Sequence, residues 1–211
     1  MKLFYSPGSP YARMVRVALV ELGLDSDVEK QEVTLRDPES ALLPYNKVGR
    51  VPTLRLDDGT VLTESLLILS YLDTLCPDRP LLPRDGSDGW TTLARFGTAM
   101  GLMDGIAVWN RELRRPEHER SPPVLALELT RAGRTADALN AMVADGAYAG
   151  PMDTARIALG CVLGYCERRH RTWDWRPGRP ALAAWYESIA QTPSFQATLP
   201  PQGPPPGPPL G

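Results

Sequence analysis

Hydrophobic and polar positions follow two different periods in the first part of the chain. Residues 2–6 form a short run of aromatic and aliphatic side chains, which is typical of a β-strand. Over residues 10–22 the apolar positions recur every three or four residues, as on an amphipathic helix. Ser9 and Pro10 before that run and Gly23 after it are common helix start and stop signals. The pattern therefore predicts a strand followed directly by a helix.

The next segments extend this to a small mixed sheet. Residues 27–35 alternate weakly and predict a second strand, and residues 36–50 are polar and predict a loop. Two short strands, 52–56 and 60–63, flank an Asp-Asp-Gly turn, and residues 64–76 have the length and apolar face of a helix. Strands joined by a helix pair in parallel, whereas a hairpin pairs antiparallel. We therefore expect an α/β domain over residues 1–76.

The alternation stops beyond residue 76. Residues 77–89 are rich in proline, glycine and aspartate and predict a linker. The following segments have helical length and are separated by proline or glycine clusters; they are 90–115, 123–145, 153–170 and 180–191. We expect an all-helical domain over residues 90–199. Residues 200–211 are proline-rich and predict a disordered tail.

Composition limits the partners and the cellular compartment expected for this two-domain protein. With 211 residues and a formal net charge of -2, the chain has no electrostatic bias toward nucleic acid or an anionic membrane. No apolar stretch approaches the roughly 18 residues of a membrane span. The N-terminus lacks the apolar core of a signal peptide. Three irregularly spaced cysteines favour a reducing compartment, so we expect a cytoplasmic protein.

Ser9 is the first candidate for chemistry. A side chain at the start of a helix lies among unpaired N–H groups and the positive end of the helix dipole, which favour a thiolate. A free thiol is only about 3% ionised at pH 7, and lowering its pKa by two units requires about 2.7 kcal/mol. One hydrogen bond to a charged group supplies about 1.5–3 kcal/mol. Ser9 can therefore hold the thiolate of a ligand; the alternative is that it only caps its helix.

Two further motifs suit the recognition of a peptide. Pro52 opens a strand and so belongs at an edge or a bend. Thioredoxin-like folds, which this segment resembles, place a cis-proline here, and that resemblance implies that the backbone of Val51 is free to pair with an extended ligand. Glu64 and Ser65 stand at the start of an apolar helix. The carboxylate of Glu64 can bind an amine of a ligand, and the N–H groups of the helix start together with the Ser65 hydroxyl can bind a carboxylate of the same ligand. Each has a plain alternative, which is a loop proline for the first and a helix cap for the second.

The order of these motifs resembles the glutathione S-transferase family. Ser-Pro-Tyr, Gly-Arg-Val-Pro and Thr-Glu-Ser stand at the family's spacing, and the resemblance extends to about residue 199, nearest a bacterial group without an assigned substrate. It implies a thioredoxin-like N-terminal domain and an all-α C-terminal domain. It also implies glutathione as co-substrate with no metal, a homodimer, and a role in detoxification.

The resemblance also implies residue roles. The glutathione-binding residues are Ser9, Arg50, Val51, Pro52, Glu64 and Ser65. Ser9 would face the sulfur as the catalytic residue, although Tyr5 and Ser6 lie near the same turn and remain alternatives. Val51 would pair its backbone with the cysteinyl unit, and Pro52 would be cis. Arg50, and less directly Arg36, would neutralise the glycyl carboxylate.

The helical half is expected to hold a small hydrophobic electrophile. By resemblance, the first long helix after the linker lines that pocket, and the candidates on it are Met100, Met103, Asp104 and Ala107. The family also has a capping box in its sixth helix, and here Asp153 can cap while Arg156 replaces the usual acidic partner. Other reactions on the same site are a glutathione-dependent isomerase, lyase or peroxidase. A non-catalytic glutathione-fold protein is a further alternative.

Other kinds of site find no support in the sequence. No glycine-rich phosphate loop and no Gly-x-Ser-x-Gly motif is present. Cys166 and His170 lie four residues apart on a predicted helix, but two ligands do not make a zinc site.

Overall fold

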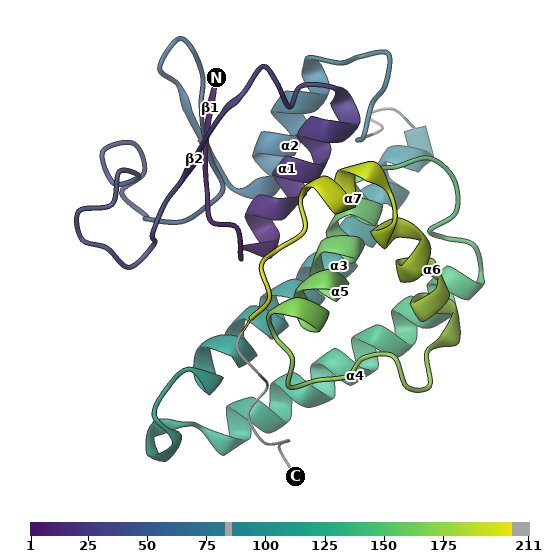
Figure 1. Ribbon diagram of the computed structural model, residues 1–211. Helices are drawn as coiled ribbons and strands as arrows, with labels where there is room; N and C mark the ends of the chain where they lie inside the picture. Colours follow the sequence, from purple (N-terminus) through teal and green to yellow (C-terminus); the bar gives the residue numbers. More distant parts are fainter. Residues whose placement is uncertain (83–85, 204–211) are drawn as a thin grey trace.

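The computed structural model describes residues 1–82 and 86–203, and its N-terminal part contains a four-stranded mixed sheet (Figure 1). The strands are β1 (Lys2–Tyr5), β2 (Glu29–Glu32), β3 (Thr53–Arg55) and β4 (Val61–Thr63), in the order β2-β1-β3-β4. β1 pairs with β2 in parallel, and the other two pairs are antiparallel. The mixed sheet predicted from the alternation is confirmed.

Two helices, α1 (Pro10–Leu22) and α2 (Ser65–Thr74), pack against each other on one side of this sheet (Figure 1). Ser9 begins α1, and its Oγ accepts a hydrogen bond from the backbone N–H of Ala12 at 3.2 Å. Gly23 ends the helix with a φ of 74°, a left-handed conformation that glycine adopts without strain. The predicted start and end of this helix are confirmed.

The opposite side of the sheet is covered by the loop of residues 34–51. Phe4 from β1 packs against Leu42 and Val51, and its ring stacks on Tyr45 with 5.0 Å between the centroids. Burying this apolar cluster fixes the loop against the sheet. The loop therefore delivers Arg50 and Val51 to the edge of the sheet near the start of α1.

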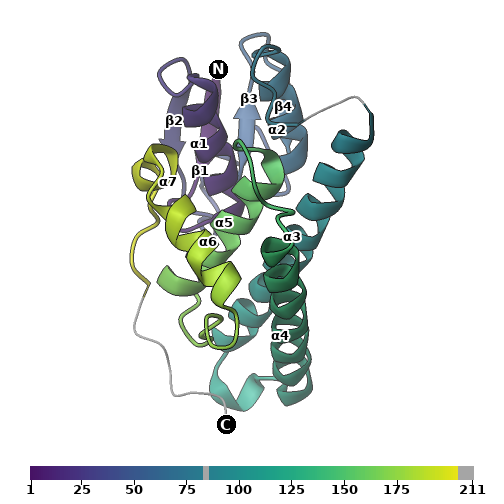
Figure 2. The ribbon, with the colours of Figure 1, turned by 90° about the vertical axis from the view of Figure 1, so that its right-hand side faces the viewer.

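The C-terminal part is helical (Figure 2). Its helices are α3 (Gly86–Leu113), α4 (Pro122–Ala144), α5 (Thr154–Arg168), α6 (Pro180–Ala190) and α7 (Pro193–Ala197), with a 3₁₀ turn at Glu117–Glu119. α5 is almost entirely buried and packs on both α3 and α1, while α3 and α4 run side by side. Together with the sheet, this gives the two-part architecture expected from the sequence. In the part of the chain described, no helix is both long and apolar enough to cross a bilayer.

Element boundaries differ from the prediction at the linker and at the end of the chain. α3 begins at Gly86, within the predicted linker 77–89, and Asp88 in its first turn suits the positive end of the helix. α7 begins at Pro193, where proline is well tolerated at the first helical position. The backbone of Pro200 and of Gly203 hydrogen-bonds to Arg168 at the end of α5. Residues 204–211 of the predicted tail lie outside the described residues.

Asp153 and Arg156 form a buried ionic cap at the start of α5. Asp153 is 7% exposed, and its Oδ1 accepts from the backbone N–H of Arg156 at 2.8 Å. Its Oδ2 accepts from the side chains of Arg156 and Arg95, at 2.5 and 3.5 Å. Arg156 also donates to the backbone carbonyls of Tyr148 and Pro151. The predicted cap is confirmed, and Arg156 replaces the acidic partner with an ion pair of its own.

Arg13 joins the two domains. It lies on α1, is 2% exposed, and donates from Nη2 to the backbone oxygen of Phe195 at 3.0 Å and from Nε to Thr198 Oγ1 at 3.4 Å. Its guanidinium also stacks over the Phe195 ring, 4.9 Å from the centroid. The helix that begins at Ser9 is therefore attached to the C-terminal end of the helical domain.

We expect Gly160→Ala to destabilise the packing of α5 against α6 and α7 within the helical domain. A Cβ at this position of α5 would lie 2.5 Å from the Phe195 ring and 3.0 Å from Ile189, so both side chains would have to move. Overpacking of this kind costs about 1–3 kcal/mol of unfolding free energy. Urea denaturation measures the loss.

Gly97→Ala on α3 is the matched control. Nothing lies within 4 Å of a Cβ at Gly97, so alanine is expected to stabilise the helix by about 0.5–1 kcal/mol. Equal effects of the two substitutions would contradict close packing around Gly160.

Candidate functional site

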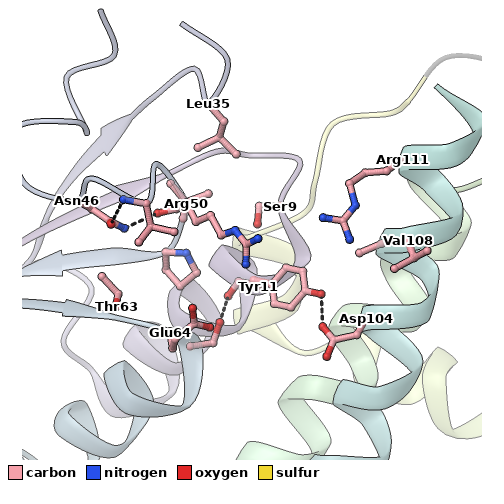
Figure 3. A pocket seen from close by; sticks show the side chains of 15 residues that line it. Ser9, Tyr11, Leu35, Asn46, Arg50, Thr63, Glu64, Asp104, Val108 and Arg111 are labelled. Carbon is pink, nitrogen blue, oxygen red and sulfur yellow. Dashed lines mark hydrogen bonds between the residues drawn. The ribbon is translucent and has the colours of Figure 1, made fainter. Parts of the chain in front are cut away.

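A cavity of about 510 Å³ lies between the sheet domain and α3 (Figure 3). Its N-terminal wall consists of Ser9, Tyr11, Leu35, Asn46, Val48, Arg50, Val51, Pro52, Thr63, Glu64 and Ser65. Its other wall consists of Asp104, Ala107, Val108 and Arg111 from α3. All six residues predicted to bind glutathione therefore surround one cavity, whereas Arg36 is exposed outside it.

Ser9 lies in this cavity at the first turn of α1. Its Oγ accepts from Ala12, and among the described residues its O–H donates to no protein acceptor. Tyr5 and Ser6 are not part of the lining, and the Tyr5 ring packs under the guanidinium of Arg16 at 4.9 Å. The geometry therefore leaves the hydroxyl of Ser9 available to a ligand and favours it over both alternatives.

The peptide bond between Val51 and Pro52 is cis, as the resemblance implied. The side chain of Asn46 stabilises the turn that precedes this cis peptide bond. The side chain, only 5% exposed, donates to the backbone oxygen of Arg50 at 3.2 Å and to Thr53 Oγ1 at 2.9 Å, and accepts from the backbone N–H of Val48 at 2.9 Å. Asn46 was not predicted. An asparagine three residues before a glycine, able to bond its own backbone two residues on, is the signal that marks such a turn.

Glu64 and Ser65 border the cavity at the start of α2. Glu64 has a φ of 67°, a left-handed conformation that is unusual for a residue with a side chain and costs about 1–3 kcal/mol. Its side chain makes no capping hydrogen bond, so the first N–H groups of α2 have no side-chain cap. The Oγ of Ser65 donates to the backbone oxygen of Tyr11 at 3.3 Å. The free N–H groups at this helix start can bind an anion, and the Glu64 carboxylate can bind a cation.

The α3 wall corrects part of the predicted second-substrate pocket. Asp104 and Ala107 line the cavity, but Met103 is 1% exposed within the core, and Met100 packs against that core outside the lining. The reason is helical rotation, since the four lining residues recur at i, i+3, i+4 and i+7 and so share one face. Val108 and Arg111 were not predicted, although they continue the same period one turn further.

Tyr11 connects the two walls of the cavity. Its hydroxyl donates to Asp104 Oδ1 at 2.5 Å, which Figure 3 shows as the contact between the sheet domain and α3. Burial, and then the bond to the Asp104 carboxylate, raise the pKa of Tyr11 well above its ordinary value. The phenol therefore stays protonated near neutral pH and acts as a donor. Tyr11 was not predicted as a site residue.

The thiols of the chain do not reach this cavity. Cys161 and Cys166 are buried in α5, and burial raises the pKa of Cys161 to about 12 and also raises that of Cys166. Cys76 donates to the backbone oxygen of Leu22 at 3.6 Å. Within residues 1–82 and 86–203 there is no group of three side chains that could hold a metal ion. A thiolate at Ser9 must therefore come from a ligand.

Comparisons with known proteins agree in both halves of the chain. Residues 3–80 match the family description "Glutathione S-transferase, N-terminal domain", and residues 122–188 match "Glutathione S-transferase, C-terminal domain". An uncharacterized GST-like protein, YibF of Escherichia coli strain K12, is 28% identical over 96% of this chain and 100% of its own length. A probable maleylacetoacetate isomerase of Caenorhabditis elegans is 39% identical over 71 residues, which is 34% of this chain and 33% of that protein.

A solved structure extends the similarity to three dimensions. A glutathione transferase family member from Pseudomonas fluorescens Pf-5, crystallised with bound glutathione, is 40% identical over 95% of this chain and 98% of its own, with a TM-score of 0.88. That similarity spans both domains. The chain therefore belongs to the glutathione S-transferase family.

Proposed function

We propose that the protein is a glutathione transferase that binds glutathione in this cavity and directs its thiolate at a small electrophile held against α3. The observation that carries the proposal is the convergence of all six predicted glutathione residues on one cavity. The bound glutathione of the Pseudomonas relative, which is similar over 95% of this chain, supports it.

Each charged group of glutathione has a complement on the N-terminal wall. The γ-glutamyl carboxylate meets the uncapped N–H groups at the start of α2, among them that of Ser65, and the ammonium group of the same unit meets Glu64. The backbone of Val51 pairs with the cysteinyl unit as an added strand would. Arg50, whose side chain points into the cavity, pairs with the glycyl carboxylate (Figure 3). This arrangement directs the sulfur toward Ser9.

The chemistry follows from thiolate formation and proximity. The Ser9 hydroxyl donates a hydrogen bond to the sulfur, which stabilises the thiolate relative to the thiol and releases its proton to solvent. The sulfur lone pair then forms a bond to an electrophilic carbon of the second substrate. A leaving group departs with its electron pair, or an unsaturated acceptor takes up a proton from water. Holding both reactants in one cavity makes this step effectively unimolecular.

An isomerase is the second candidate, favoured by the match to a probable maleylacetoacetate isomerase over 71 residues. On the same site the thiolate would add to a double bond and leave again after rotation. Glutathione would then be regenerated, whereas conjugation consumes it. Measuring free thiol during turnover separates the two reactions.

The proposal includes the setting that the resemblance implies, a cytoplasmic homodimer that acts in detoxification. Trp90 at the start of α3 is 77% exposed, and Leu67 on α2 is 60% exposed. Large apolar side chains open to solvent in a single chain are stabilised when a second copy covers them.

Glu64→Gln is expected to raise the dissociation constant for glutathione about tenfold, because an ion pair with the ligand's ammonium group becomes a neutral hydrogen bond. Isothermal titration calorimetry of the full chain measures this. Glutamine keeps the size of the side chain and so limits effects on the strained backbone at this position. Conjugation to a panel of aromatic and epoxide electrophiles then tests the transferase step.

Glu39→Gln is the control, since Glu39 is an exposed carboxylate of the same domain that does not line the cavity. It is expected to leave the affinity for glutathione unchanged. A wild-type protein that binds no glutathione at millimolar concentration would show that the proposed function is wrong. Equal effects of the two substitutions would show that Glu64 does not contact the ligand.

A further inference from the structure

The α3 wall of the cavity carries a cation, Arg111, whose side chain has no partner within the described residues. The side chain of Arg111 extends from α3 into the cavity (Figure 3), and among the described residues it takes part in no hydrogen bond or ion pair. The next acidic residue along the helix, Glu112, is already engaged, because it accepts from the backbone N–H of Ser121 at 2.6 Å and lies 3.7 Å from Arg115. Arg111 is therefore available to a ligand.

The acidic residue of the same wall does not neutralise Arg111. Asp104 accepts from Tyr11, and seven helical positions separate it from Arg111, which corresponds to about 10 Å along the helix axis. Arg111 nevertheless lies close enough to the Tyr11 hydroxyl to act against the rise of its pKa. The positive charge of Arg111 therefore acts on a group that lines the cavity.

The proposed function, on which this inference rests, leaves Arg111 unassigned. Every charged group of glutathione is matched on the N-terminal wall, so the second substrate must lie against α3. There Ala107 and Val108 form a small apolar surface between Asp104 and Arg111. The surface suits a compact carbon frame, and the guanidinium at its end suits an anion, since it binds a carboxylate through two parallel hydrogen bonds.

We infer that the second substrate is a small carboxylic acid with an electrophilic carbon, and that Arg111 binds its carboxylate. The carbon frame packs on Ala107 and Val108, which places the electrophilic carbon between α3 and the sulfur at Ser9. A chloronitrobenzoate illustrates the balanced step: the sulfur–carbon bond forms, the carbon–chlorine bond breaks, and chloride leaves with the electron pair. The thiol proton goes to water. With an unsaturated acid, sulfur adds at the β-carbon and water protonates the α-carbon.

Product affinity tests the inference without requiring turnover. Calorimetry compares S-(2-carboxyethyl)glutathione with S-propylglutathione, which share the glutathione moiety and differ in the carboxylate. We expect the wild-type protein to bind the carboxylate product about tenfold more tightly, as a charge-assisted bidentate pair would produce. Arg111→Gln should abolish this preference, and Arg111→Lys should retain part of it. Arg114→Gln, an exposed arginine outside the cavity, should leave it intact.

Turnover provides the second readout. The ratio of kcat/KM for 4-chloro-3-nitrobenzoate to that for its methyl ester is expected to fall about tenfold in Arg111→Gln and not in Arg114→Gln. Because the two substrates share the leaving group and the ring, this ratio isolates recognition of the carboxylate from general loss of activity.

The outcomes separate the inference from the proposed function. Suppose that the wild-type protein binds glutathione, but that the preference for the carboxylate product and the acid-to-ester ratio of kcat/KM are the same in wild type and Arg111→Gln. The inference is then wrong and the proposed function stands. If Arg111→Gln lowers affinity or rate equally for the acid and the neutral compound, Arg111 acts on glutathione or its thiolate, which also overturns the inference. If the wild-type protein binds neither glutathione nor its conjugates, both fail together.

Discussion

Ser9→Ala is expected to lower kcat/KM for conjugation about ten- to a hundredfold near pH 6.5. The hydroxyl contributes one hydrogen bond to a charged sulfur, about 1.5–3 kcal/mol, which corresponds to one to two units in the pKa of the bound thiol. Without it, the pKa returns toward the value of free glutathione, and each unit lowers the thiolate fraction tenfold below that pKa. The structure supports this role because the Ser9 hydroxyl lies in the cavity with its proton uncommitted in the part of the chain described.

The pH dependence distinguishes thiolate stabilisation from general damage. A hydroxyl that donates to the thiolate lowers the bound thiol's pKa, so its loss matters most at acidic pH and least above about pH 9, where the free thiol is itself ionised. Rate profiles of wild type and Ser9→Ala should therefore converge as pH rises. Ser9→Thr keeps both the hydroxyl and the helix cap and should retain most activity. Ser6→Ala is the matched control, and loss of activity there instead of at Ser9 would assign the sulfur contact to Ser6.

Asp153→Ala is expected to lower the unfolding free energy by about 3–5 kcal/mol, the usual effect of removing one partner of a buried ion pair. The carboxylate is the acceptor for the first turn of α5 and the counter-ion of Arg156, which is itself 5% exposed. Without it, a buried guanidinium loses its only anionic partner within 3 Å among the described residues. Because α5 packs on both α3 and α1, the loss should lower the unfolding free energy of the whole chain and not only the stability of one helix.

Two further substitutions resolve the contributions to this loss. Asp153→Asn keeps a capping oxygen but removes the charge, so the difference between Asn and Ala measures the cap, about 1 kcal/mol. Asp137→Ala removes an exposed carboxylate that pairs with Arg179 at 2.7 Å and should cost at most about 1 kcal/mol. Urea denaturation of the three variants checks these values. A loss at Asp153 no larger than that at Asp137 would contradict a buried ionic cap.

Local sequence signals were sufficient to predict most of the N-terminal wall of the site. Ser9, Pro10 and Gly23 determine where α1 begins and ends through their backbone preferences alone. The helix start at Ser65 follows a short and contiguous motif, whereas the cis bond before Pro52 was implied by the resemblance to the family. Residues that act through their own turn or cap can be predicted because the interactions that position them lie within a few residues of the chain.

Residues that depend on the contact between the domains could not be predicted in this way. Tyr11 and Asp104 are 93 positions apart, and nothing in either segment indicates that they meet. The choice between Met103 and Arg111 as cavity residues depends on how α3 is rotated about its axis, which packing against α5 determines. The start of α3 within a glycine-rich stretch was missed for a related reason, since tertiary packing overrides weak helix propensity.

The attachment of Arg13 to Phe195 and Thr198 constrains how such proteins can diversify by recombination. A chimaera that joins this N-terminal domain to the helical domain of a relative would leave the Arg13 guanidinium without its acceptors, unless the recipient also supplies a carbonyl and a hydroxyl there. The helix α1, which Ser9 caps, and α7, the last helix of the described residues, must therefore be inherited together, although most of the sequence lies between them.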